Sequence, residues 1–307
     1  MSLHQSSGNW RLGLALSLLT VFLWGVLPIA LTVALQGLDA YTVTWFRFLV
    51  SFVLLGVYLS ARKQLPSGEK LLSLPKGLFL TAVIFLALNY ILYLLGLSYT
   101  TPANAQVLIQ LAPVLMGLGG IYIFKERYTL IQWIGLAGLT LGFVLFFNEQ
   151  LKTLITSQGK YLFGSGLIII AAITWAIYGL AQKQLLQQLS SANIMLLIYG
   201  SCALIFAPFA NPQPILSLNL LQFSMLLFCA LNTIVAYGAF AESLEHWEAS
   251  RVSAVLAAAP IVTLASVWAV ALLFPQWIFT NNLTILGVLG AILVVVGSMT
   301  IALGKKS

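Results

Sequence analysis

The fold is decided by Leu111-Ala112-Pro113-Val114 and Ala258-Ala259-Pro260-Ile261, two similar stretches that each lie within a long apolar segment. Similar landmarks surround both stretches in the same order and at similar intervals. They are a tryptophan before the proline and a Gly-x-x-Gly pair after it: Trp24, Gly135 and Gly138 in the first half, Trp175, Gly287 and Gly290 in the second. The two halves of the chain therefore repeat one another.

The composition is that of an integral membrane protein. Of the 307 residues, 61% are hydrophobic and only 7% are charged, whereas a soluble domain has about 25% charged residues. A transmembrane helix needs roughly 20 mostly apolar residues. We expect ten such segments, near residues 11–36, 40–60, 76–97, 103–124, 130–148, 162–182, 191–210, 217–241, 250–273 and 281–303.

Five spans in each repeat are an odd number, so the second repeat enters the membrane from the opposite side. The sequence predicts an all-α integral membrane fold with ten transmembrane helices in two inverted five-helix repeats. The repeats cover residues 11–148 and 162–303, and residues 149–161 form a polar linker between them. Inverted repeats give a carrier two related ways to open a central site, which is the basis of alternating access.

The basic residues orient the chain. With both termini in the cytoplasm, only Lys152 and Lys160 fall in outer loops, as the positive-inside rule requires. The basic residues that then fall inside are Arg11, Arg62, Lys63, Lys70, Lys76, Lys125, Arg127, Lys183, Arg251, Lys305 and Lys306. The excess of basic residues that gives the pI of about 9.5 is therefore explained by orientation of the chain in a lipid bilayer and not by nucleic-acid binding. We expect a multi-pass protein of the cell (inner) membrane.

The segment from Tyr122 to Gly142, with Glu126 in a short turn before a glycine-bearing helix, resembles the drug/metabolite transporter superfamily in its EamA-type branch. Trp24-Gly25, Arg47 and Ala112-Pro113 fit the same resemblance. It implies export of small metabolites through a cavity formed by the first, third, fourth, sixth, eighth and ninth helices. The second repeat has Phe274-Pro275-Gln276-Trp277 where the acidic turn would recur. Glu126 is therefore expected to be a local feature of the inner face.

Polar and aromatic residues within the spans are candidates for the lining of a substrate cavity. Amides at mid-membrane depth and aromatic walls suit amphipathic solutes such as amino acids. Each also has a structural alternative, either interhelical hydrogen bonding or bundle packing. The candidates are Trp24, Asn89, Tyr93, Gln106, Gln110, Trp175, Tyr178, Asn232 and Ser253.

Arg47 is the one charge that lies well within a span. It is a candidate for binding a substrate carboxylate, but it equally suits pairing with backbone carbonyls or snorkelling towards the membrane surface. Pro113 and Pro260 are predicted helix hinges, since proline removes a backbone hydrogen bond near midspan. Glycines of the fifth and tenth spans favour close helix packing or self-association, and a homodimer is one expected assembly.

No cofactor or metal site is expected, because the sequence has no P-loop, HExxH, GxSxG or Cys/His cluster. A transporter of small molecules is favoured over an enzyme, for which only Glu242 to Glu248 beside His246 would qualify. A passive pore and a proton-coupled drug/metabolite antiporter remain alternatives. Facilitated movement is preferred over proton antiport, because no convincing carboxylate lies at the membrane midplane.

Overall fold

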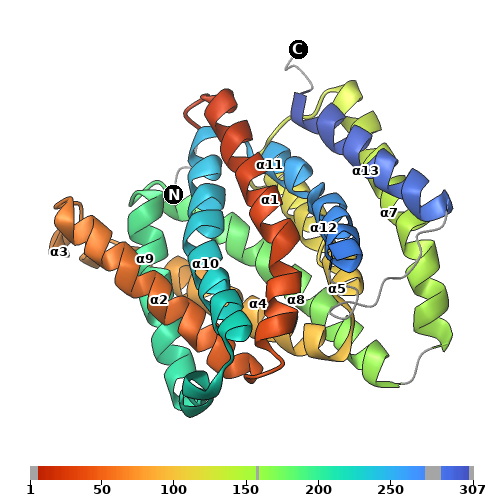
Figure 1. Ribbon diagram of the computed structural model, residues 1–307. Helices are drawn as coiled ribbons and strands as arrows, with labels where there is room; N and C mark the ends of the chain where they lie inside the picture. Colours follow the sequence, from red (N-terminus) through yellow and green to blue (C-terminus); the bar gives the residue numbers. More distant parts are fainter. Residues whose placement is uncertain (1–5, 157–158, 274–284, 304–307) are drawn as a thin grey trace.

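The computed structural model describes residues 6–156, 159–273 and 285–303, and all regular structure in these ranges is helical (Figure 1). Eight helical segments are long and apolar enough to cross a membrane, and two shorter apolar stretches lie in α7 and α13. The predicted all-α membrane fold is confirmed. The helices are α1 Trp10–Ala34, α2 Ala40–Ala61, α3 Gly68–Leu72, α4 Lys76–Tyr99, α5 Pro102–Leu108, α6 Leu111–Ile123, α7 Leu130–Thr156, α8 Gly159–Leu185, α9 Ser191–Phe206, α10 Leu220–His246, α11 Ala249–Leu256, α12 Ala259–Leu273 and α13 Ile285–Leu303.

The structure differs from the predicted spans in two respects. The fourth and ninth spans are each split into two helices, α5 with α6 and α11 with α12. The predicted linker 149–161 is mostly helical, because α7 continues to Thr156 and α8 begins at Gly159. The turn at Phe274-Pro275-Gln276-Trp277 lies outside the described residues.

Side chains at the helix ends account for where several helices begin. Asp39 opens α2 by accepting hydrogen bonds from the backbone N–H groups of Tyr41 and Thr42. At the start of α7, the Thr129 N–H donates to Gln132 Oε1 at 3.0 Å, and the Gln132 N–H reaches Thr129 Oγ1 at 3.4 Å. Both arrangements satisfy N–H groups that have no partner within the helix.

The main helix pairs each join one helix of the first repeat to one helix of the second. Interchanging the two repeats maps this set of pairs onto itself. The first helix of each repeat packs on the third helix of the other, which gives the pairs α1–α10 and α4–α8. The second helices form the pair α2–α9, and the fifth helices form the pair α7–α13. Figure 1 shows α2 and α9 on one side of the bundle, with α7 and α13 side by side at the opposite edge. This exchange is what a pseudo-twofold relation between the repeats requires.

Glycines let α7 and α13 approach closely. A Cβ atom added at Gly297 would lie 2.5 Å from the Leu139 backbone nitrogen, and one at Gly135 would lie 2.9 Å from the Gly297 carbonyl oxygen. Gly142 is held in the same way, with the Val294 nitrogen 2.7 Å from an added Cβ. The glycine faces that favoured packing or self-association therefore pack on each other within one chain.

We expect Gly297→Ala to lower the thermal stability of the purified protein in detergent. Backbone atoms of α7 cannot move aside as a side chain would, and overpacking of this kind costs about 1–3 kcal/mol. The matched control is Gly238→Ala in α10, where an added Cβ meets nothing within 4 Å. The control variant should unfold at or above the wild-type temperature, and equal unfolding temperatures for both variants would contradict the close α7–α13 contact.

Candidate substrate cavity

Two helix breaks lie near the centre of the bundle, one in each repeat. Between α5 and α6 the Ala112 N–H donates to the Ile109 carbonyl at 2.9 Å, and between α11 and α12 the Ala258 N–H donates to the Val255 carbonyl at 3.0 Å. Pro113 and Pro260 follow these breaks in the first turn of α6 and of α12. A proline is tolerated there, because the N–H that it lacks would have no partner within the helix.

A cavity lies between the repeats beside these breaks. The volume of this cavity that is open to the centres of water molecules is about 80 Å³. This leaves room for several water molecules or a small solute. Eight of the residues singled out in the sequence line it: Trp24, Arg47, Asn89, Tyr93, Gln106, Gln110, Pro113 and Trp175. Residues of both repeats therefore enclose one cavity.

Further lining residues were not anticipated from the sequence. Tyr90 and Tyr237 contribute rings, and Leu27, Leu31 and Leu256 contribute apolar surface. Tyr90 directly follows Asn89, and both line the cavity. Tyr237 carried no signal of its own, because its neighbours along the chain from Val235 to Ala241 are apolar.

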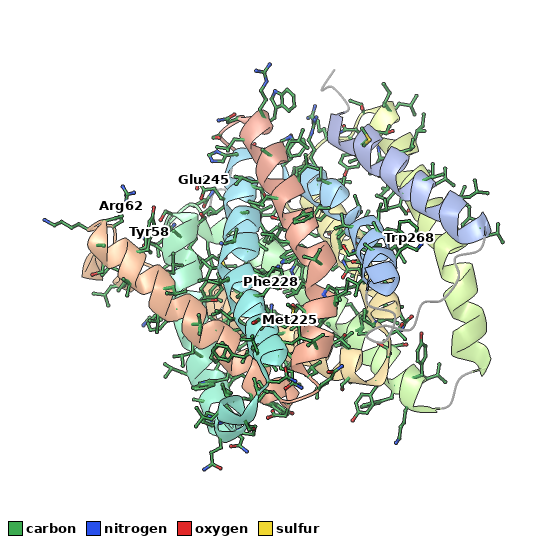
Figure 2. The ribbon with its side chains drawn as sticks, viewed as in Figure 1. Tyr58, Arg62, Met225, Phe228, Glu245 and Trp268 are labelled. Carbon is green, nitrogen blue, oxygen red and sulfur yellow. The ribbon has the colours of Figure 1, made fainter. Side chains whose placement is uncertain are left out.

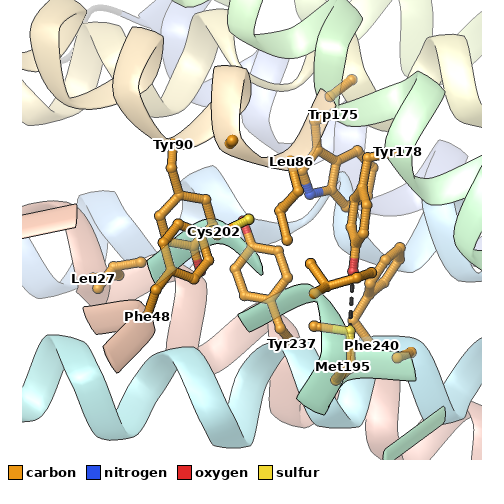
Figure 3. Packing of buried hydrophobic residues seen from close by; sticks show 14 of the residues in the cluster. Leu27, Phe48, Leu86, Tyr90, Trp175, Tyr178, Met195, Cys202, Tyr237 and Phe240 are labelled. Atoms are coloured by element: carbon orange, nitrogen blue, oxygen red, sulfur yellow. Dashed lines mark hydrogen bonds between the residues drawn. The ribbon is translucent and has the colours of Figure 1, made fainter. Parts of the chain in front are cut away.

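Three predicted cavity residues lie elsewhere. Tyr178 is not among the lining residues, and its hydroxyl donates to Met195 Sδ at 3.3 Å (Figure 3). Asn232 bridges two helices, since its Nδ2 donates to the Leu23 carbonyl at 2.7 Å. Ser253 donates to the Ser250 carbonyl at 2.9 Å and borders a separate, smaller pocket. Tyr178 and Asn232 thus make the interhelical contacts of the structural alternative, whereas Ser253 bonds within its own helix.

The pseudo-equivalent tryptophans of the two repeats meet at the wall of the cavity. Trp24 of α1 packs edge-on against Trp175 of α8, with ring centroids 5.5 Å apart. Tyr237 lies 4.8 Å from Trp24, and Phe240 lies 4.9 Å from Trp175. The two edge-to-face pairs, Trp24 with Trp175 and Trp24 with Tyr237, each add roughly 0.5–1.5 kcal/mol to area burial. The aromatic cluster therefore joins the repeats where they border the cavity.

Some polar atoms of the lining have partners and others do not. Asn89 donates from Nδ2 to the Ala171 carbonyl of α8 at 2.9 Å. Gln110 Oε1 and Trp24 Nε1 are buried without a hydrogen-bond partner in the structure. Because an unmet buried polar atom costs about 1–3 kcal/mol, an acceptor and a donor are left available at this cavity.

Arg47 lies among the lining residues and is 2% exposed. Its Nε donates to Thr233 Oγ1 at 3.0 Å, and its Cζ lies 4.5 Å from the centroid of the Tyr90 ring. Burial excludes the snorkelling alternative for this side chain. The contacts fix the guanidinium at the cavity.

Glu126 joins the two repeats at the end of the bundle where α1 begins, which we call the Glu126 end. Its Oε1 accepts from Lys183 Nζ of α8 at 2.8 Å and from the Ala249 N–H at 3.0 Å. Its Oε2 accepts from the Ser250 N–H at 3.0 Å. These N–H groups belong to the first turn of α11, where the helix dipole favours a negative charge. Glu126 is thus not a local feature of its own turn, because its partners belong to the other repeat.

The backbone around Glu126 has two features that leave room for its carboxylate between the repeats. Lys125 has a positive φ of 56°, which costs energy in a non-glycine residue. An added Cβ at Gly120 would lie 2.7 Å from Glu126 Oε2, so glycine leaves room for the carboxylate. Burial raises the pKa of Glu126, but the Lys183 ammonium and hydrogen bonds from Lys183 and Ser250 outweigh it and hold the pKa below its usual value.

The acidic and histidine cluster weighed for an enzyme lies at the same end. His246 Nδ1 is 2.9 Å from Ser7 Oγ, and His246 Nε2 is 3.4 Å from Glu242 Oε1. Ser191 Oγ donates to the other Glu242 oxygen. These contacts tie the N-terminal segment and α9 to the end of α10. Among the residues that the structure describes, no group of three His, Cys, Asp or Glu side chains is placed to hold a metal.

Among the described residues, eight membrane-length apolar helices and two shorter apolar ones, with a cavity shared between the repeats, define a multi-pass membrane transporter. The model of the EamA-like transporter family matches residues 11–148 and again residues 162–303. The chain therefore belongs to the EamA-like transporter family, within the drug/metabolite transporter superfamily.

Relatives share nearly the whole chain. The uncharacterized inner membrane transporter YhbE of Escherichia coli K12 is 37% identical over 297 residues, covering 96% of this chain and 92% of that protein. An uncharacterized transporter of Haemophilus influenzae is 35% identical and covers 96% of both chains. A probable amino-acid metabolite efflux pump of Escherichia coli K12 is 27% identical and covers 92% of both.

A solved crystal structure has the same fold. It matches this chain with a TM-score of 0.70 at 15% sequence identity, covering 97% of this chain and 98% of that chain. At this identity the likeness concerns the fold alone.

Proposed function

We propose that the protein exports amino acids or similar amphipathic solutes by alternating access through the cavity between its repeats. The observation that carries the proposal is the cavity itself, which combines residues of both repeats and has unpartnered polar atoms beside aromatic rings. The name of the efflux-pump relative supports the solute class and the direction. The proposed location is the inner membrane, as its relatives' names support.

The sides of the membrane follow from the positive-inside rule. It assigns the Glu126 end, with both chain termini, to the cytoplasm. The cavity residues of α2 and α4 lie nearer the opposite ends of their helices, since Arg47 is eight residues from Asp39 and Tyr93 is seven from Thr100. The ion pair of Glu126 with Lys183 joins the two repeats at the Glu126 end. We therefore assign this arrangement to a state closed towards the cytoplasm.

Facilitated movement is the proposed mode of transport. The cavity lining includes no Asp or Glu among the described residues, so no carboxylate there is available to carry a proton. The buried carboxylate of Glu126 is held charged by Lys183. A passive pore is the second candidate, and it would conduct without saturation. An enzyme is disfavoured, because the family and the named relatives are transporters.

Counterflow into proteoliposomes tests the proposed function. Liposomes preloaded with an unlabelled amino acid should accumulate the same labelled amino acid transiently and saturably, without a proton gradient. Uptake that requires a proton gradient would replace facilitated movement with antiport. Unsaturable flux would favour the pore, and absence of counterflow for every amino acid would overturn the solute class.

We expect Gln110→Leu to lower counterflow about tenfold or more while leaving the amount of protein in the membrane unchanged. The substitution removes the unpartnered Oε1 acceptor, and a hydrogen bond to a charged group is worth roughly 1.5–3 kcal/mol. The matched control is Gln213→Leu, because Gln213 is exposed at the start of the short 3₁₀ helix Gln213–Ser217 and does not line the cavity. Equal flux in both variants would remove Gln110 from the proposed solute contacts.

A further inference from the structure

We propose that Arg47 binds the carboxylate of the transported solute, and that Gln110 receives a hydrogen bond from the solute's amino group. The cavity then selects zwitterionic amino acids over amphiphiles that carry only a positive charge. The inference rests on the proposed transport function, and it assigns solute contacts to residues that face one cavity.

The first argument concerns the charge of Arg47. The three ion pairs of the described residues join Glu126 with Lys183, Glu242 with His246, and Glu248 with Arg251. None of them includes Arg47. The acid nearest to it along α2 is Asp39, two helical turns away, and its carboxylate caps the helix start. A charge buried in a membrane is costly and is retained where it has a function.

The second argument concerns how the guanidinium is held. Thr233 Oγ1 accepts the hydrogen bond of the Arg47 Nε–H, and the Tyr90 ring covers one face of the guanidinium. Thr233 Oγ1 itself donates to the Cys229 carbonyl at 2.9 Å, which leaves its lone pairs for Arg47. The side chain is therefore fixed by neutral partners that satisfy one donor and leave its charge uncompensated. A carboxylate both fits the planar geometry of the guanidinium donors and neutralises the positive charge.

The third argument distinguishes a carboxylate from a phosphate. Of the residues that the structure describes, the other deeply buried cation is Lys183, at 3% side-chain exposure, and Glu126 already neutralises it. One free positive charge matches one negative charge, whereas a phosphate ester at neutral pH carries between one and two. The cavity therefore fits a monocarboxylate better than a phosphorylated solute.

The fourth argument concerns the other end of the solute. Gln110 is 3% exposed and lines the cavity, and its Oε1 has no hydrogen-bond partner. An ammonium group offers three donors and no acceptor, which is the complement of this oxygen. Trp24 Nε1 is an unpartnered donor in the same lining and suits the carboxylate. A zwitterion satisfies all these groups, while a cation leaves Arg47 unmatched and adds repulsion.

Binding to the purified full-length protein in detergent tests the inference independently of transport. The probes are L-phenylalanine, its amide (a cation without a carboxylate) and 3-phenylpropanoate (a carboxylate without an amine). Calorimetry should give the tightest binding for L-phenylalanine, weaker binding for 3-phenylpropanoate and none for the amide. Equal or tighter binding of the amide, or no binding of any probe, would overturn the inference.

Variants of Arg47 provide the second measurement. Arg47→Gln should weaken L-phenylalanine binding about thirty-fold or more, the loss typical of removing one partner from a buried charge pair, and Arg47→Lys should recover part of it. The control is Arg62→Gln, which removes an exposed arginine from the C-cap of the same helix (Figure 2). Wild-type affinity in a folded Arg47→Gln protein would overturn the inference. If the Arg47→Gln protein does not fold, binding of the three probes to the wild-type protein still tests whether the cavity recognises a carboxylate.

The two measurements separate this inference from the proposed function. Saturable counterflow of a different solute, together with preference for the amide, would leave a carrier in place and remove the role of Arg47. Binding of L-phenylalanine through Arg47 without any counterflow would leave the site in place and remove the carrier.

Discussion

Replacing Glu126 with glutamine should open the Glu126 end of the bundle. The substitution leaves the Lys183 ammonium buried without its counter-charge, and breaking a buried pair in this way costs roughly 3–5 kcal/mol. Opening that end would return Lys183 to water and remove the cost. A difference of about 3 kcal/mol shifts an equilibrium between closed and open states more than a hundredfold.

Thiol labelling measures this opening. Ser253→Cys places a reporter in the small pocket that Gly117 and Tyr128 border, where the native serine is 2% exposed. The native Cys202 and Cys229 are buried and would be replaced by alanine. Maleimide labelling of the reporter should be at least tenfold faster in the Glu126→Gln protein than in its parent.

Two controls make the result specific. Glu126→Gln combined with Lys183→Met removes both charges and should restore slow labelling, because no unpaired charge then remains buried. Glu245→Gln removes a partly exposed carboxylate at the same end (Figure 2) and should leave labelling unchanged. Slow labelling in the single Glu126→Gln variant would contradict the role of the ion pair in closure.

Because the pKa of Glu126 is held below its usual value, the ion pair should resist acid. A carboxylate with a lowered pKa stabilises the closed arrangement above its ordinary pKa and loses that effect as the pH falls through the lowered value. At each pH from 8 down to about 5, above the ordinary glutamate range, labelling should therefore stay at least tenfold slower than in the Glu126→Gln protein at the same pH. The comparison at equal pH corrects for the smaller thiolate fraction at low pH.

Replacing Trp175 with alanine should have the largest effect among substitutions in the cavity wall. Trp175 is 4% exposed and packs against Trp24 of the other repeat and against Phe240. Truncating a buried tryptophan costs about 3–5 kcal/mol. We expect a lower unfolding temperature and the loss of most counterflow, since the substitution breaks the aromatic contact between the repeats.

Matched variants separate this effect from the loss of a tryptophan in general. Trp268→Ala truncates a tryptophan of α12 that is 66% exposed (Figure 2), and it should leave both measurements near the wild-type values. Trp175→Phe keeps a ring in the wall and should recover most of the stability. Wild-type unfolding temperature and flux in Trp175→Ala would contradict the assignment.

The sequence was sufficient for features that depend on local pattern. Apolar runs set the spans, and the prolines preceded by helix breaks are those singled out as hinges. The equivalence of Trp24 and Trp175 came from their order along the two repeats, and the structure places them in direct contact.

Features that depend on helix rotation and on long-range contacts were not accessible in this way. Tyr178 lies three residues from Trp175, within reach of the same helical face, yet packing against α9 turns it towards Met195. The partner of Glu126 is Lys183, 57 residues away, and the sequence used that lysine only to orient the chain. Its other partners are backbone N–H groups, which leave no mark in an amino-acid sequence.

The pairing of α1 with α10 has a consequence for how the protein is made. About 190 residues separate the end of α1 from the start of α10, so synthesis at 5–20 residues per second leaves α1 without its main neighbour for roughly 10–40 s. During that interval the surface that will receive Asn232 and Tyr237 faces lipid or the insertion machinery. The first repeat is thus inserted before its packing is complete, and α1 gains its main neighbour only when the second repeat follows.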